Sequence, residues 1–157
     1  MKKIIVLLIC LIVLTSCNED NDSRVNIYNE MINNINNADD FIEKSEHYSV
    51  TFETTFTSDG QRYYIVIDNP TAAMYDVTVL AFEQGTDTDI EFAPNAGIFE
   101  GNINMIPNQI NKDHGFVKGV SISGILKNSM APIYCLVQWK DEKSSHVYRE
   151  YLILNEK

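Results

Sequence analysis

The sequence predicts a mainly β protein in which an amphipathic helix precedes an antiparallel sandwich of seven to eight short strands. Three observations support this fold class. Between residues 25 and 44, apolar residues recur at helical spacing. After Tyr48 the period becomes two, and turn residues separate the alternating runs at regular intervals. No helical pattern occurs between these runs, which favours antiparallel strand pairing.

Residues 24–47 are expected to form the helix, with Asp22 or Ser23 able to cap its start. Asparagine, a poor helix former, fills much of the polar face, so the helix needs its apolar stripe packed on the domain that follows. A helix lying in a membrane interface is the alternative, but its polar face would favour Lys and Arg. The apolar stripe consists of Tyr28, Met31, Ile32, Ile35, Ala38, Phe41 and Ile42.

Residues 48–157 are expected to form the strand domain. Two runs flank the turn Ser58-Asp59-Gly60 and predict a hairpin, because glycine tolerates positive φ. From Tyr48 to Leu154 the chain has 107 residues, close to the ~100 of an immunoglobulin-like sandwich. A small β-barrel is the alternative. Strands are predicted at residues 50–56, 62–68, 75–82, 90–92, 98–105, 116–126, 133–140 and 147–154.

The first 17 residues have the layout of a secretory leader. Lys2 and Lys3 form a short positive region, and residues 4–14 are apolar. These 11 apolar residues are too few to span a bilayer as a permanent helix. The run ends in Leu14-Thr15-Ser16-Cys17, which resembles the lipobox of bacterial lipoproteins.

That resemblance implies that residues 1–16 are removed and that Cys17 carries lipid. Two or more acyl chains would anchor the protein stably, at about 0.8 kcal/mol per buried methylene. Residues 17–23 would then be a flexible acidic tether, similar to the acidic run of surface-exported lipoproteins in Bacteroidetes-type bacteria. The expected location is the outer membrane, with the protein exposed at the surface. A position facing the periplasm, anchoring in the plasma membrane and an ordinary signal peptide are the alternatives.

The chain is acidic, with a net charge of −10 from 12 basic and 22 acidic residues. An acidic surface repels phosphate backbones and anionic headgroups, so nucleic acid is excluded as a partner class. We expect membrane attachment through the lipid anchor alone.

Few residues indicate chemistry. Cys10 lies in the leader, and Cys135 alternates with apolar residues, which predicts a buried small hydrophobe. His47, His114 and His146 are isolated, without metal-ligand spacing. No catalytic motif and no cofactor are predicted. The weak metal candidates are Asp87, Asp89 and Glu91, whose alternate spacing could present oxygen ligands to calcium, although a solvated strand edge is favoured.

Aromatic residues provide the candidate binding residues. Tyr134 and Leu136 alternate away from the apolar face of their strand, and either Tyr148 or Tyr151 should be exposed. An exposed row of Tyr134, Leu136 and Tyr148 could anchor a protein partner or stack on sugars. Alternatively, the helix covers this face. The expected function is a non-catalytic protein-binding or assembly module of the cell envelope. A carbohydrate-binding lipoprotein and an envelope hydrolase are the alternatives.

Overall fold

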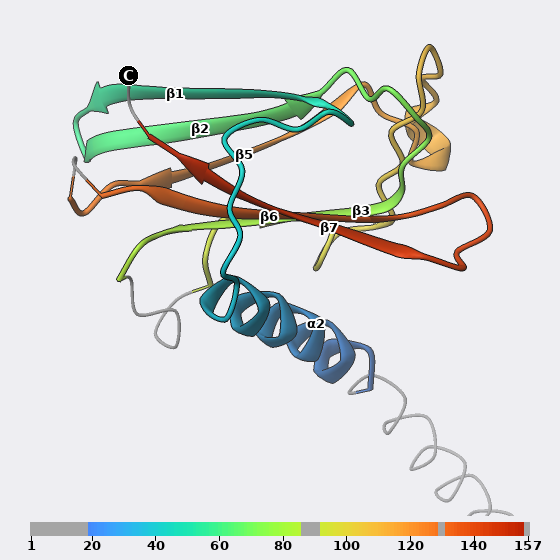
Figure 1. Cartoon of the computed structure of the whole chain (residues 1–157), viewed down its shortest axis with the longest axis horizontal. Coiled ribbons are helices and arrows are strands. Elements are labelled where there is room, and N and C mark those ends of the chain that lie inside the picture. Colours follow the sequence, from blue (N-terminus) through green and yellow to red (C-terminus); the bar gives the residue numbers. More distant parts are fainter. Residues whose placement is uncertain (1–18, 86–91, 129–130, 156–157) are drawn as a thin grey trace, which may run out of the picture.

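The computed structural model of the 157-residue chain describes residues 19–85, 92–128 and 131–155 (Figure 1). Strands dominate these residues. Seven strands form two antiparallel sheets, and α2 (Glu19–Asn36) is the single α-helix among them. The prediction of a mainly β protein is therefore confirmed. None of the helices within the three described ranges is long and apolar enough to cross a membrane.

The strands are β1 (Ser49–Thr57), β2 (Gly60–Asp68), β3 (Tyr75–Glu83), β4 (Asn95–Ala96), β5 (Gly119–Ile125), β6 (Ile133–Lys140) and β7 (Val147–Leu154). One sheet has the order β1-β2-β5 and the other β4-β3-β6-β7, with every adjacent pair antiparallel. The hairpin predicted around the Ser58-Asp59-Gly60 turn is β1–β2. The described strands thus form two separate sheets, rather than the small barrel given as the alternative.

The first hydrophobic core lies between the two sheets. Alternate residues of β2 and β6 enter it, as the period of two predicts. Cys135 is a free cysteine with no exposed surface, and burial raises the pKa of its thiol to about 12. Its predicted role as a buried small hydrophobe is confirmed. The largest side chains of this core include Tyr63, Ile65, Ile67, Met74, Met105, Ile133, Trp139 and Leu152.

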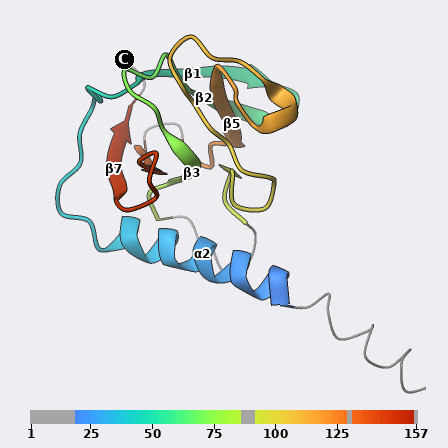
Figure 2. The same ribbon diagram turned by 90° about the vertical axis from the view of Figure 1, so that its right-hand side faces the viewer.

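A second core lies between α2 and the four-stranded sheet. Figures 1 and 2 show α2 on the face of this sheet that points away from β1, β2 and β5. The tyrosine of α2, Tyr28, accepts a hydrogen bond from the Ala93 backbone N–H at 2.7 Å. The helix therefore covers the outer face of the sheet, as one of our two interpretations requires. The second core consists of Tyr28, Met31, Ile32, Ile35, Leu80, Phe82, Ala93, Ile98 and Leu136.

Helix α2 differs from the expected range of 24–47 at both ends: it begins at Glu19, so residues 19–23 of the expected flexible tether, including the expected caps Asp22 and Ser23, are helical, and it ends at Asn36. Where the helix stops, the Asn33 carbonyl accepts hydrogen bonds from both the backbone N–H of Asn37 at 3.1 Å and the Asn37 side chain at 2.7 Å. The stripe residues Phe41 and Ile42 therefore lie in an extended segment. Figure 1 shows this segment, residues 37–48, crossing β7 on its way from α2 to β1.

Two loop regions differ from the predicted strands. Residues 98–105 form no strand, and only two isolated bridges occur there, Met105 with Met74 and Asn104 with Phe116. Gly97, at φ +78°, bends the chain at the start of this region. Phe116, expected to begin a strand, pairs instead with Asn111 in the loop before β5. Two residues of the short strand predicted at 90–92 lie outside the described residues.

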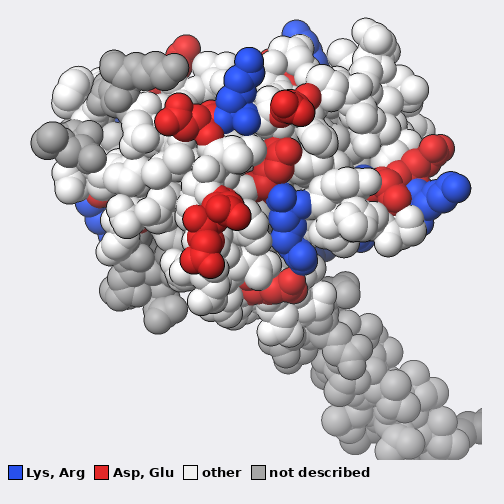
Figure 3. Space-filling model, viewed as in Figure 1, with Lys and Arg blue, Asp and Glu red and all other residues white. Residues whose placement is uncertain are grey.

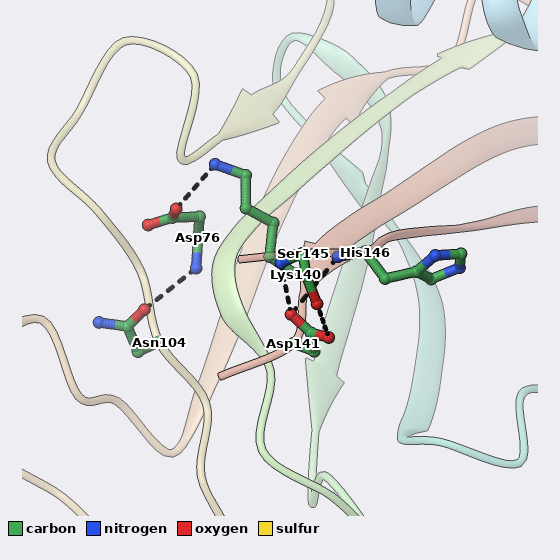
Figure 4. A network of polar contacts seen from close by, with 6 residues as sticks. All are labelled: Asp76, Asn104, Lys140, Asp141, Ser145 and His146. Carbon is green, nitrogen blue, oxygen red and sulfur yellow. Dashed lines mark hydrogen bonds and ion pairs between the residues drawn. The ribbon is translucent and has the colours of Figure 1, made fainter. Parts of the chain in front are cut away.

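A polar network holds the end of the four-stranded sheet (Figure 4). Asp76 has φ +48°, at a register shift between β3 and β6. Its backbone N–H donates to Asn104 Oδ1, and its carboxylate accepts from Lys140 Nζ, both at 3.0 Å. The Asp141 carboxylate closes the β6–β7 turn, since it accepts bonds from the Ser145 backbone and hydroxyl, both at 2.8 Å.

Candidate functional site

The structure does not bring the three predicted binding residues together. Leu136 has no exposed surface, because α2 packs on it. Tyr134 lies on the same face and stacks on Phe41, with ring centroids 4.6 Å apart. Tyr148 pairs with the core residue Trp139, and directly paired residues share a face, so Tyr148 lies on the opposite side of the sheet.

Tyr148 belongs to an aromatic cluster at the end of the first core. Its ring stacks on Trp139 at 5.4 Å and meets His146 edge to face at 4.5 Å. The His47 ring also lies beside Trp139, with the two ring centroids 5.5 Å apart. The cluster therefore gathers two histidines that are remote in sequence. Tyr148 is 38% exposed, and His47 and His146 are exposed as well, so the cluster is open to solvent on the side away from Trp139.

A buried phenol and a carboxylate lie beside this cluster. Within the described residues, Tyr48 Oη and Glu150 Oε2 are buried without a hydrogen-bond partner. Burial raises the pKa of Tyr48 far above its ordinary range, and the negative charge of Glu150 raises it further. The other Glu150 oxygen, Oε1, lies 3.6 Å from His47 Nδ1. Tyr48 therefore stays protonated at any physiological pH.

The described residues offer no candidate metal centre. Across the described ranges, no three His, Cys, Asp or Glu side chains are placed to hold a metal ion. His114 is exposed at the end of the short 3₁₀ helix Lys112–His114. The predicted calcium candidates Asp87, Asp89 and Glu91 lie outside the described residues.

A groove lies between β1 of one sheet and β7 of the other. Each of these strands is the last of its sheet. Along the opposite side, β5 lies against β3 and β4, so the two sheets are in contact there. The groove has a volume of about 760 Å³. Its lining residues are Glu43, Val50, Thr51, Phe52, Glu53, Thr54, Ile153, Leu154 and Asn155.

The groove has an apolar floor and an acidic rim. Val50 and Phe52 are partly buried and pack against the first core. Glu43 and Glu53 are exposed, and no Lys or Arg is among the lining residues. In the orientation of Figure 1, further Asp and Glu side chains are spread over the face that carries β7 and segment 37–48 (Figure 3).

The position of β1 at the edge of its sheet is a further feature of the groove. In an antiparallel pair, alternate residues direct their backbone N–H and C=O groups away from the partner strand. Within the described part of the chain β1 is the edge strand of its sheet, and its only strand partner there is β2. Edge strands are commonly protected by Pro, Lys or a bulge. Strand β1 contains no Pro or Lys, and its register with β2 is unbroken.

The sequence alone did not predict this groove, because the order of strands in a sheet depends on long-range pairing. One local signal was available, since the Ser49–Thr57 run is long and regular and contains no Pro or Lys. Comparisons of the chain with models of protein families, with curated proteins and with solved structures give no match.

Proposed function

We propose that this chain is a non-catalytic binding module that docks another protein of the cell envelope. The observation that carries the proposal is the groove between β1 and β7, which combines an apolar floor with the edge strand of a sheet. Both features favour association with a polypeptide, because apolar side chains of a partner gain contacts in such a groove and sheet edges are common sites of peptide recognition.

The proposal includes a lipid anchor on Cys17 and a location at the outer membrane. The lipobox-like motif supports the anchor, and the acidic run after Cys17 supports exposure at the cell surface. A position facing the periplasm remains the alternative. In this arrangement the acyl chains hold the protein at the membrane, while the acidic folded part stays in solvent.

We further propose that the strand domain is an immunoglobulin-like sandwich with α2 as an added layer. Support comes from the two stacked sheets, the shared core between them and the length of residues 48–154. Binding modules of this architecture have no need of a catalytic cleft, which fits a docking role.

Carbohydrate binding is the second candidate function. It is favoured by the partly exposed Tyr148 ring, with the exposed His146 beside it. We place it second because Tyr148 already makes ring contacts with both Trp139 and His146. The stacking surface that a sugar would use is therefore shared with this chain's own rings.

Site-specific photo-crosslinking tests the docking proposal. A photoreactive phenylalanine analogue replaces the exposed groove residue Thr51 in the full chain, produced in its own bacterium. The matched control carries the analogue at Ser121, an exposed position on β5, away from the groove. We expect one discrete protein to crosslink from position 51 and none from position 121. Equal crosslinking from both positions, or none from position 51, would contradict the proposal.

Cys17→Ser tests the anchor independently. The substitution removes the thiol that would carry lipid, so we expect the protein to leave the membrane fraction and to migrate without the mass of the acyl chains. Retention in the membrane fraction would show that Cys17 is not the anchor. The variant leaves the groove unchanged, so loss of anchoring and loss of docking are measured separately.

A further inference from the structure

On the basis of the proposed lipid anchor, we infer that one corner of the folded part lies against the bilayer that holds Cys17. The corner consists of Ile27 and Tyr28 on α2 and of Phe92 and Phe99 in the loops on either side of β4. We call these four residues the apolar corner. Attachment still comes from the acyl chains, and the apolar corner sets how the sandwich is oriented on the membrane.

The chain between the anchor and the fold is very short. Helix α2 begins at Glu19, two residues after Cys17. Because the Cα atoms of neighbouring residues are about 3.8 Å apart, those of Cys17 and Glu19 lie within about 8 Å of each other. The folded part therefore has no long tether on which to stand away from the bilayer. Lipid on Cys17 would keep the start of α2 at the membrane surface.

The apolar corner lies near this starting point. A helix rises about 1.5 Å per residue, so Tyr28 lies about 14 Å along the axis from Glu19. The Tyr28 ring meets the Phe92 ring edge to face, with the ring centroids 4.8 Å apart. Arg24 Nη1 donates a hydrogen bond to the Phe99 carbonyl at 2.9 Å. Both loops are therefore held against the N-terminal and middle turns of α2.

The apolar corner presents side chains to solvent. Phe92 is 56% exposed, although its ring contacts both Tyr28 and Phe99. Ile27 is 40% exposed and lies nearest to Cys17 in sequence among the exposed large apolar residues of the described ranges. Figures 1 and 2 show both sheets on the same side of α2. The exposed side chains are therefore open to a flat surface that approaches along the helix.

Confinement by the anchor makes a small apolar surface sufficient. Apolar and aromatic side chains gain free energy when they move from water into the headgroup region of a bilayer. Two exposed side chains are too few to bind a membrane from free solution, where association also costs translational and rotational freedom. An anchored domain meets the bilayer at a high effective concentration, so the acyl chains would already have met that cost. The apolar corner then only has to select one orientation.

The charge of the chain selects the type of surface. Residues 17–27 include three acidic residues and one basic residue, Arg24. Acidic residues repel anionic headgroups, so an uncharged or zwitterionic surface is favoured. The net charge of −10 also disfavours pairing of two copies of this chain through the apolar corner. The bilayer that holds the anchor is therefore the favoured occupant.

Fluorescence quenching by lipids tests whether the apolar corner meets the bilayer. The full lipid-modified chain carries Phe92→Cys, labelled with a polarity-sensitive fluorophore, in phosphatidylcholine vesicles with a nitroxide quencher on the headgroups. Labelling is selective, because Cys135 has no exposed surface, Cys17 would carry lipid and Cys10 would be removed with the leader. The matched control is Phe56→Cys, since Phe56 is exposed and lies on β1, in the sheet remote from α2. We expect a blue shift and strong quenching at position 92 and neither at position 56.

A second experiment measures the contribution of Phe92 itself. The label is moved to the helix through Ile27→Cys, in a chain that either keeps Phe92 or carries Phe92→Ser. Loss of Phe92 should lower quenching at position 27 by roughly half, because it removes the more exposed apolar side chain of the corner. Phe56→Ser makes the same change on β1 and should leave quenching at position 27 unchanged. Addition of anionic phosphatidylglycerol to the vesicles should weaken the quenching at low salt.

Several results would overturn the membrane orientation. These are equal quenching at positions 92 and 56, absence of quenching at position 92, or equal effects of Phe92→Ser and Phe56→Ser. A blue shift at position 92 that grows with protein density, without quenching by lipid, would identify a second copy as the occupant instead. If the chain stays on the vesicles through Cys17 in each of these cases, the anchor stands and only this orientation fails.

Discussion

Ile42 and Leu152 form a parallel β-bridge in which the segment after α2 binds the outer edge of β7. The Ile42 N–H donates to the Tyr151 carbonyl at 2.8 Å, and the Ile153 N–H donates to the Ile42 carbonyl at 3.1 Å. These two hydrogen bonds attach segment 37–48, which connects α2 to β1, to the four-stranded sheet. It also fixes Glu43 at the rim of the groove.

Removal of the Ile42 N–H should loosen this connection. Ile42→Pro deletes one of the two bonds and should lower the free energy of unfolding by about 1 kcal/mol or more. Ile42→Ala keeps the backbone bonds and removes a side chain that is 37% exposed, so its cost should be smaller. Urea denaturation measures both, and equal costs would show that the bridge adds no stability.

Leu136→Ala should destabilise the fold and should not act as a binding mutation. Leu136 is fully buried between β6 and α2, and deletion of a buried leucine side chain costs about 2–5 kcal/mol. Ile110→Ala is the matched control, since Ile110 is 64% exposed and should cost well under 1 kcal/mol. A stable Leu136→Ala protein with impaired partner binding would restore Leu136 as a binding residue.

Substitution of two glycines by alanine distinguishes the cost of backbone strain from the cost of steric overlap. Gly97 has φ +78°, and a Cβ there would collide with the Val77 carbonyl oxygen. Gly85 has a similar φ of +83° but no described atom within contact distance of a Cβ. Gly85→Ala should therefore cost only about 1 kcal/mol of conformational strain, and Gly97→Ala should cost distinctly more. Equal changes in the urea midpoint would argue against the tight approach of residue 97 to β3.

The β6–β7 turn should open only in acid. Hydrogen bonds from the Ser145 side chain and backbone lower the pKa of Asp141 below its ordinary value of 3.8. A carboxylate with a lowered pKa stabilises the fold above its unfolded pKa, and that contribution is lost as the pH falls through its folded pKa. The Ser145 amide signal should therefore show a titration step below about pH 4, where Asp141 becomes protonated. Asp141→Asn should show no such shift.

Local patterns predicted most of the strands. The alternation in β1, β2, β6 and β7 and the glycine turn between β1 and β2 are properties of neighbouring residues, and the structure has them where expected. Residues 98–105 show the limit of this approach. Their composition suits a strand, but no neighbouring strand offers them a continuous ladder, and only the isolated bridges of Asn104 and Met105 form there.

The candidate site was harder to predict because it depends on long-range pairing. The face on which Tyr148 lies follows from its register with Trp139, which the β6–β7 turn sets. Leu136 alternates away from the first core as expected, yet α2 covers it from more than a hundred residues earlier in the chain. To predict the groove, one must know that β1 and β7 are both the last strands of their sheets, and no single segment of the sequence carries that information.

The crossing of β7 by segment 37–48 also has a mechanical consequence. If Cys17 is held in a membrane and β1 is held by a partner, tension between them runs through α2 and this segment before it reaches either sheet. The packing of α2 and the two Ile42 hydrogen bonds would yield first. The helix and the segment would then detach from the sheet and extend, while the two sheets and the docked chain would stay folded under the same force.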